Sequence, residues 1–252
     1  LLVCEEKTPA IRAIDLDTGD LLGIVPIPEI AKTRRVNRGL ESLAVDPDGS
    51  HIWTATEEAV PGDGPAASPT AGTVVRLMRI AVPGAESAAG EAQFAYAADP
   101  PHRFLRIFTG EPLAGVTALV ALDRGRLLVL ERAAGPGLPP FTSALYLVET
   151  RVSADVTDVS GGLANRTELH ISKTPLWRDA LGCNVEGLCL GPVLADGGQT
   201  LVAVADNGGL GTPTQLIGLV MREAPRAVDA SAVGGAAAIV GVVLLLVRIT
   251  SP

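Results

Sequence analysis

Acidic residues end four apolar segments that recur along the chain, and these carboxylates are the side chains best suited to chemistry. Glu57, Glu131 and Asp206 take this place in three segments, and Glu5 or Glu6 takes it in the first. Carboxylates that converge in a region of low dielectric constant repel one another. A hard cation such as calcium, which binds several oxygen ligands, relieves that repulsion. The pattern therefore predicts a calcium site where the segments meet.

A second acidic position lies near the start of the strand that precedes each acid-ended segment. Glu41 and Glu186 occupy it in two repeats, and Thr117 occupies it in the middle one. Asn184 and Asn207 can add amide oxygens to the site. An alternative is that the acids only pair with arginines or cap turns, as acids at strand ends commonly do. The expected metal ligands are Glu41, Glu57, Glu131, Glu186 and Asp206.

The elements that must position these acids are short strands joined by tight turns. Apolar runs at 39–45 and 51–58 flank Asp46-Pro47-Asp48-Gly49, and runs at 115–122 and 126–132 flank Asp123-Arg124-Gly125. Turns of this composition between apolar runs are strong hairpin signals. Further strands are expected at 73–80, 91–96, 144–148, 168–171, 184–190, 200–207 and 214–220. The unit is about four strands and recurs roughly every 75 residues.

Radial repetition of four-stranded sheets is typical of a β-propeller. We therefore expect an all-β propeller domain over residues 1–222, with about four visible blades, the first and last incomplete, and an incomplete ring. Because the chain opens directly on an apolar strand without Met, we expect it to be truncated at its N-terminus. A β-sandwich of repeated hairpins is the structural alternative.

Charge and composition narrow the class of partner. The formal net charge of −8 disfavours a nucleic acid partner, because a polyanion would be repelled, and it fits cation binding or plain solubility. Only Lys7, Lys32 and Lys173 are lysines, so arginines supply most positive charge, and arginine is the better bidentate phosphate ligand. The three cysteines form no disulfide framework. The sequence also lacks a Gly-x-Ser-x-Gly elbow, a Walker loop and a dinucleotide fingerprint.

Five motifs, in order, resemble those of the phytase-like family, also described as esterase-like. In that family they read Asn-x-Gly-x-Glu-Gly, an acidic strand end, Leu-x-Leu-Glu-Arg, Asn-x-Glu-Gly and Ser-Asp-Asn. Ser42 and Ala205 depart from the pattern, and the resemblance spans residues 1 to about 220. The matching segments are Asn37–Ala44, Thr56–Glu58, Leu128–Arg132, Asn184–Leu188 and Ala205–Asn207.

The resemblance implies a secreted or surface propeller that hydrolyses phosphate esters with calcium. Bound metal would hold phosphate oxygens and activate water. The implied substrate contacts are Arg38 and Arg132, joined by Asn184 and Asn207, with Arg35 as a further candidate. The ligand would be a small phosphate ester or another anion, and no residue stands out as a catalytic acid or base. Two alternatives remain open: a non-catalytic propeller that binds a partner, and a calcium-dependent lactonase.

The C-terminal segment predicts a membrane anchor, with a buried strand or helix and a glycolipid-anchor signal as alternatives. Residues 230–247 carry no charge after Asp229, and Arg248 follows them. A helix of this length spans about 27 Å, close to the hydrocarbon core of a bilayer. We expect a linker over 223–229 and a transmembrane helix over 230–249. The propeller is then expected to be extracellular, periplasmic or lumenal.

Overall fold

The computed structural model describes residues 1–84, 91–101, 105–106, 112–135, 137–179, 182–206, 214–223, 240–243 and 249–250, of which 105–106, 124, 179, 223, 240–243 and 249–250 are described by their backbone alone. The described elements are strands, with a single short α-helix and a few 3-10 turns among them, and the sheets are antiparallel. The chain divides into two compact units, Leu1–Asn184 and Val185–Pro252. The all-β expectation is therefore confirmed.

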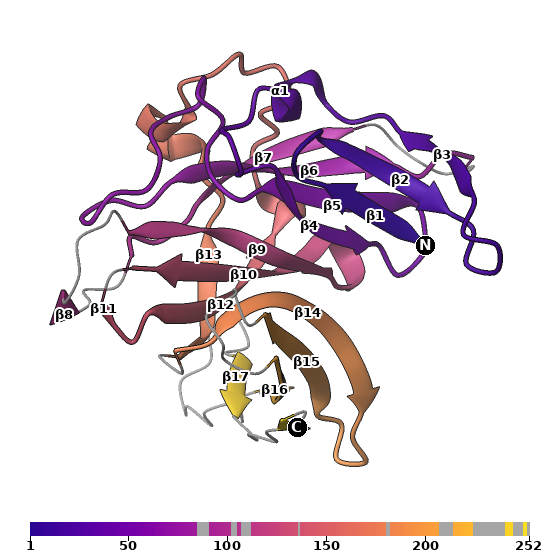
Figure 1. The fold of residues 1–252 in the computed structure, drawn as a ribbon, viewed down its shortest axis with the longest axis vertical. Coiled ribbons are helices and arrows are strands. Elements are labelled where there is room, and N and C mark those ends of the chain that lie inside the picture. The colour runs from indigo at the N-terminus through magenta and orange to yellow at the C-terminus, as the bar shows by residue number, and fades with distance from the viewer. Residues whose placement is uncertain are drawn as a thin grey trace, which may run out of the picture. The chain divides into compact units, whose positions relative to one another are not determined.

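The first unit holds three sheets that follow one another along the chain (Figure 1). The first sheet contains β1 (Leu2–Glu5), β2 (Ala10–Ile14) and β3 (Leu21–Val25), and α1 (Glu29–Lys32) follows it. The second sheet contains β4 (Leu40–Val45), β5 (His51–Thr56), β6 (Val74–Ala81) and β7 (Ala92–Ala97). The third contains β9 (Leu113–Ala121), β10 (Arg126–Ala134), β12 (Phe141–Glu149) and β13 (Lys173–Asp179).

Smaller elements complete this unit. β8 (Leu105–Arg106) pairs with β11 (Gly137–Leu138). Four 3-10 turns lie at Asp123–Gly125, Thr150–Val152, Leu163–Asn165 and Thr167–Leu169. The last turn lies where the sequence analysis expected a strand at 168–171. The fourth strand of the third sheet is instead β13, which begins at Lys173.

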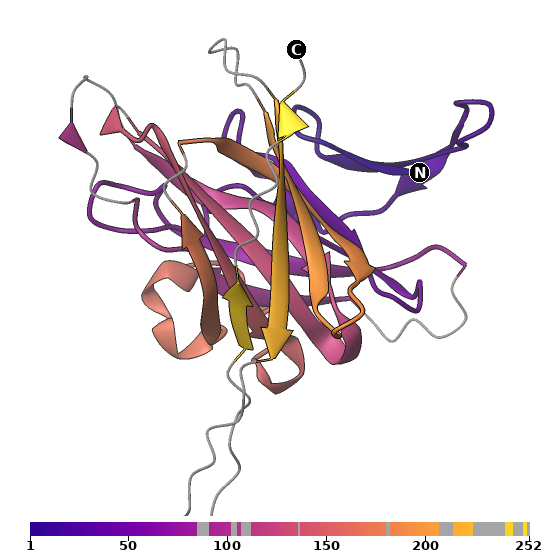
Figure 2. The ribbon, with the colours of Figure 1, turned by 90° about the horizontal axis from the view of Figure 1, so that it is seen from below.

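The second sheet is buried on both faces. Side chains alternate between the two faces of a strand, so a strand that is buried at every residue is covered on both sides. Every residue of β5 is buried. Ile52 packs toward the first sheet with Ile11, Val25, Met78 and Ile80. Trp53 faces the opposite way, and its apolar cluster joins residues of the third sheet: Val116, Leu119, Leu127 and Val129. Successive sheets therefore stack face to face, as both views of the ribbon show (Figure 1, Figure 2).

The second unit is one further antiparallel sheet. It contains β14 (Asn184–Val193, whose first residue belongs to the first unit), β15 (Gln199–Asp206), β16 (Gln215–Glu223) and β17 (Val240–Val243). β18 (Ile249–Thr250) pairs with the other end of β16. The strands β14, β15 and β16 fall where the sequence predicted them.

The C-terminal prediction of a helix is wrong for the part of residues 230–249 that the structure describes. Val240–Val243 forms a strand that pairs with β16 from Val220 to Glu223. Val and Ile, which are frequent in this segment, favour strands as well as apolar surroundings, so hydropathy alone could not separate the two states. The described residues include no helix with the length and hydropathy needed to cross a membrane. Ile249 begins β18, and Glu223, the first residue of the linker predicted over 223–229, ends β16. Residues 224–239 and 244–248 lie outside the described residues.

A buried arginine fastens two loops to the second sheet. Arg76 on β6 donates twice to Asp63, with Nε to Oδ2 at 2.6 Å and Nη2 to Oδ1 at 2.8 Å. Its other N–H groups reach the Gln93 side chain and the carbonyl oxygens of Val156 and Val159. Arg76 is only 4 % exposed. One guanidinium thus holds two loops and a neighbouring strand.

Replacing Arg76 should strongly destabilise the fold. Arg76→Met leaves Asp63 buried without its partner, which typically costs about 3–5 kcal/mol. Urea unfolding followed by circular dichroism measures the loss. Arg126→Met is the matched control, because Arg126 forms an exposed ion pair with Asp123, and such pairs contribute at most about 1 kcal/mol. Equal unfolding midpoints for the two variants would contradict this role of Arg76.

Candidate metal and anion site

A β-bulge recurs at the same place in two successive sheets. In the second sheet Leu40 pairs with Thr56 and Ser42 with Ala55, so Glu41 is an extra residue in β4. In the third sheet Ala118 pairs with Leu130 and Val116 with Glu131, so Thr117 is the extra residue in β9. A bulge redirects the side chain of its extra residue and is common beside functional sites. Glu41 and Thr117, matched by the sequence analysis, are therefore structurally equivalent.

The register beyond the bulge shows which strand ends are equivalent. The backbone N–H of Glu57 donates to the carbonyl of Gly39 at 3.0 Å, and Arg132 pairs with Gly115 at the matching place in the third sheet. Glu57 is thus equivalent to Arg132, and Glu131 to Thr56. The sequence analysis aligned Glu57 with Glu131, one residue away. Because side chains alternate, this single residue places the two acids on opposite faces of their sheets.

Glu57 lies between two guanidinium groups. Its Oε2 accepts a hydrogen bond from Nη1 of Arg38 at 2.9 Å, and its Oε1 pairs with Nη2 of Arg132. Arg132 also donates from Nη1 to Oδ1 of Asn184 at 2.7 Å. Glu57 is 2 % exposed, so its charge is balanced almost entirely by these arginines. Of the four predicted substrate contacts, Arg38 and Arg132 therefore pair with Glu57, and Asn184 holds Arg132.

Three carboxylates meet beside these arginines. Oxygen atoms of Glu6, Glu41 and Glu57 all lie within 4.8 Å of one another. Oε1 of Glu6 is buried and has no hydrogen-bond partner among the described residues. Calcium–oxygen distances are about 2.3–2.6 Å, so oxygens on opposite sides of one ion lie about 5 Å apart. The spacing and the unpartnered oxygen both fit a calcium ion.

Glu58 adds a fourth acid to this cluster. It is 4 % exposed, and Nε of Arg38 lies 3.7 Å from its Oε2. Burial raises the pKa of Glu58 above its ordinary value, although the charge of Arg38 opposes the shift. The three clustered carboxylates and Glu58 thus lie near the guanidiniums of Arg38, Arg132 and Arg35.

Glycine allows the successive sheets to approach at this site. A Cβ on Gly39 would lie 2.3 Å from the carbonyl oxygen of Glu6, and one on Gly115 would lie 2.1 Å from that of Glu57. The N–H of Val116 donates to the same Glu57 carbonyl at 3.0 Å. The contact between acidic strand end and glycine is therefore repeated from the first sheet to the second and from the second to the third.

Two other charged candidates form their hydrogen bonds and ion pairs outside the three carboxylates, although the charge of Arg35 also acts on Glu58. Glu5 pairs with Arg12 at 2.9 Å, so Glu6 is the member of the first pair that joins the site. Arg35 donates to the carbonyl oxygens of Ala59 and Gly64 and holds a loop. No signal in the sequence separates these residues from their neighbours.

Glu131 belongs to a second network, between the second and third sheets. It accepts hydrogen bonds from the Tyr96 hydroxyl at 2.5 Å, from Nζ of Lys173 at 2.6 Å and from the backbone N–H of Asp99 at 2.9 Å. Burial raises the pKa of Glu131, while Lys173 opposes the shift. The Lys173 ammonium also lies 4.2 Å from the centre of the Tyr146 ring, a cation–π contact. The structure therefore places Glu131 away from Glu6, Glu41 and Glu57.

The remaining predicted site residues belong to the second unit. Glu186 lies on β14 and is partly buried, and Asp206 ends β15 and is exposed. Both have interactions within the described chain. Asn207 lies outside the described residues. Their part in a metal or substrate site stays a prediction.

Gly115→Ala should disturb both the fold and the acidic cluster. Its methyl group would overlap the Glu57 carbonyl, and overpacking of this kind typically costs about 1–3 kcal/mol. Urea unfolding measures the change. Gly23→Ala is the control, because a methyl group added at this position on β3 would have no atom within 4 Å. Equal stability of the two variants would disprove the close approach.

Asp99 should make the free energy of unfolding vary with pH in the acid range. Burial alone would raise its pKa, but hydrogen bonds from Lys173, Tyr146 and Arg178 outweigh burial and hold the pKa below the ordinary 3.8. The folded state therefore binds this proton less readily than the unfolded state, so the stabilisation is complete above pH 3.8 and is lost as pH falls through the folded pKa.

Asp99→Asn should remove this contribution. We expect lower stability than the parent at neutral pH and a smaller difference at the acid end, from urea unfolding between about pH 2 and 7. Asp158→Asn, at an exposed loop acid, is the control. A parent-minus-variant difference that is constant with pH would contradict the assignment.

A comparison of the chain with profiles of protein families identifies the family to which it belongs. A profile described as "Phytase-like: Esterase-like activity of phytase" matches residues 1–209. No curated protein and no solved structure matches the chain. The matched region contains both strand bulges, the Glu6–Glu41–Glu57 cluster and its two arginines. Because the match covers most of the chain, this protein belongs to the phytase-like family, whose description is esterase-like activity of phytase.

Proposed function

We propose that the Glu6–Glu41–Glu57 cluster holds a calcium ion and that the chain hydrolyses phosphate esters beside it. The observation that carries the proposal is the convergence of three carboxylates within 4.8 Å, one of which has a buried oxygen without a hydrogen-bond partner among the described residues. A buried polar atom without a partner is costly, and a bound cation would supply that partner. Membership of the phytase-like family supports hydrolysis.

The two arginines are suited to holding the phosphate group. A guanidinium offers a planar pair of N–H donors that matches two phosphate oxygens. Asn184 fixes the orientation of Arg132 through the 2.7 Å hydrogen bond from Nη1. When bound, the cation would supply Lewis acidity toward a phosphoryl oxygen and lower the pKa of a coordinated water. Arg38 and Arg132 would bind the equatorial oxygens and orient the ester.

We further propose that the sheets are blades of a β-propeller. Face-to-face stacking of successive three- and four-stranded sheets and the repeated bulge with its glycine contact are the supporting features. A role of Glu186, Asp206 and Asn207 as metal or substrate ligands stays a prediction. We assign Glu131 to the packing of neighbouring blades instead, because Tyr96, Lys173 and Asp99 already occupy its oxygens.

One observation favours a non-catalytic function. Both oxygens of Glu57 are already held by guanidiniums, an arrangement that can serve structure alone. A propeller that only binds a ligand or partner at this face is therefore the second candidate. A calcium-dependent lactonase would use the same carboxylates. Membrane association through residues 230–249 and a location outside the cytoplasm stay predictions.

Turnover with and without metal tests the proposal. We expect the chain to hydrolyse phytate or p-nitrophenyl phosphate in calcium, and to lose this activity in EGTA. Glu41→Gln should reduce calcium affinity, measured by calorimetry, and kcat/KM by about 10- to 100-fold. Glu168→Gln, an exposed loop position, is the control and should leave both unchanged.

Three outcomes separate the candidates. Turnover that resists EGTA, or that survives Glu41→Gln, overturns a metal site at this cluster. Calcium binding without turnover on any phosphate ester favours the binding protein. Hydrolysis of a lactone in calcium, without turnover of phosphate esters, identifies the lactonase.

A further inference from the structure

Several polar side chains at the turns of the first unit are held by contacts within the chain. Oδ1 of Asp15 accepts hydrogen bonds from the backbone N–H groups of Asp17 and Thr18. Oδ1 of Asp155 accepts one from the backbone N–H of Thr157. Short polar side chains are favoured in turns because they bond to the nearby backbone in this way. A turn at which such side chains form no bond therefore needs another explanation.

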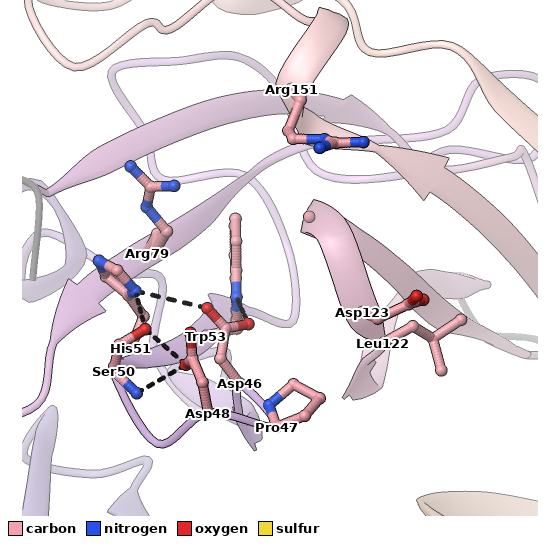
Figure 3. Close-up of a pocket in the computed structure, with 11 residues that line it drawn as sticks. Asp46, Pro47, Asp48, Ser50, His51, Trp53, Arg79, Leu122, Asp123 and Arg151 are labelled. Carbon is pink, nitrogen blue, oxygen red and sulfur yellow. Dashed lines mark hydrogen bonds and ion pairs between the residues drawn. The ribbon is translucent and has the colours of Figure 1, made fainter. Parts of the chain in front are cut away.

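A cavity at the N-terminal end of β5 follows the same rule (Figure 3). It has a volume of about 340 Å³ and lies beside the β4–β5 and β9–β10 turns. Oδ1 of Asp46 accepts a hydrogen bond from Nε1 of Trp53 at 2.8 Å, and its Oδ2 lies 3.4 Å from Nδ1 of His51. Oδ1 of Asp48 accepts hydrogen bonds from both the backbone N–H and the hydroxyl of Ser50. The carboxylates of the β4–β5 turn therefore stabilise the turn itself.

The loop between β12 and β13 is fixed to the first unit on both sides of a short segment, residues 165–168. On one side Leu163 is 0 % exposed, in an apolar cluster that includes Val74 of β6. On the other side Leu169 packs against the same cluster. Nε2 of His170 donates a hydrogen bond to the carbonyl oxygen of Leu163 at 2.8 Å. The segment between these anchors is therefore held in one place on the surface.

The four residues of this segment are all exposed, and its polar side chains do not support the turns. Asn165 ends one 3-10 turn and Thr167 begins the next, and the backbone of Arg166 between them is not helical, with φ −116° and ψ 62°. The amide of Asn165 and the hydroxyl of Thr167 form no hydrogen bond with the described part of the chain. The stability of the turns therefore does not explain an asparagine and a threonine at these two positions.

The spacing of these two residues is that of an N-glycosylation acceptor. Asn165-Arg166-Thr167 has the pattern Asn-x-Thr with a residue other than proline in the middle. The other asparagines of the chain, Asn37, Asn184 and Asn207, are not followed by serine or threonine at this spacing. A glycan is bulky and polar, so its acceptor must lie on the surface. The one asparagine with the acceptor pattern is thus exposed on an anchored loop.

We propose that the folded chain presents Asn165 as the acceptor of an N-linked glycan, which an oligosaccharyltransferase transfers from a polyprenyl diphosphate carrier. The side-chain nitrogen of Asn165 forms a bond to the anomeric carbon of the first sugar and loses a proton. The bond from that carbon to the diphosphate oxygen breaks, and the diphosphate leaves with its electron pair. The enzyme acts in the lumen of the endoplasmic reticulum, so in the cell the modification depends on the extracellular or lumenal location predicted from the sequence. The site is independent of the acidic cluster and of the reaction proposed there.

Transfer of a glycan to the folded chain is the direct test. The purified full chain is incubated with an oligosaccharyltransferase and its lipid-linked oligosaccharide, and the modified peptide is identified by mass spectrometry. We expect a glycan on Asn165 of the parent and of Thr167→Ser, and none in Asn165→Gln or Thr167→Ala. Circular dichroism should show that every variant folds as the parent does, because the replaced side chains form no hydrogen bond with the described residues. Absence of a glycan on Asn165 of the folded parent overturns the proposal.

Expression of the full chain behind a secretory leader in a eukaryotic cell gives an independent measurement. Cell extract and medium are both treated with peptide-N-glycosidase F, which removes N-linked glycans and converts the acceptor asparagine to aspartate. We expect the parent and Thr167→Ser to lose mass on this treatment, and Asn165→Gln and Thr167→Ala to stay unchanged. A chain that is glycosylated in the cell but not as the purified folded protein would mean that the enzyme accepts only the unfolded segment, and it would refute presentation of Asn165 by the folded surface.

Discussion

Burial of the second sheet on both faces is the constraint on which the rest of this structure depends. Ile52 and Trp53 are neighbours in β5, yet they enter two different apolar clusters. A sheet that is covered on both sides must lie between two others, so the strand ends of three sheets are brought to common edges. The acidic cluster at one end of β5 and the cavity at the other both follow from this stacking.

The repeated bulge sets the register that brings the acidic strand ends together between the stacked sheets. An extra residue at Glu41 shifts the register so that Glu57 opposes Gly39, and the glycine lets the Glu6 backbone approach. The same geometry at Thr117 brings Glu57 to Gly115. Each interface between sheets thus presents one strand end, one bulged side chain and one glycine. Acids at these places converge because the backbone contact recurs.

The sequence predicted the positions of the strands better than it predicted the side of each sheet on which a given side chain lies. Hairpins around Asp46–Gly49 and Asp123–Gly125 follow from turn chemistry and were found. The equivalence of Glu57 with Glu131 failed because hydrophobic alternation does not show a bulge, and one residue reverses the side of the sheet. Lys173 was not foreseen as a partner of Glu131, since its strand begins beyond the segment expected at 168–171. The helix expected over 230–249 failed at Val240–Val243, where β-branched residues suit a strand equally well.

Two buried charge clusters in the first unit differ in what their arginines hold. Arg76 directs its N–H groups to Asp63, to Gln93 and to loop carbonyls, so each donor fastens a part of the chain. Arg38 and Arg132 instead converge on Glu57, beside acids that outnumber them. A buried ion pair rarely stabilises more than apolar packing of the same volume, and an excess of buried charge stabilises less. Stability therefore explains the Arg76 cluster more readily than the group of acids around Glu57, for which we propose ligand binding as the reason.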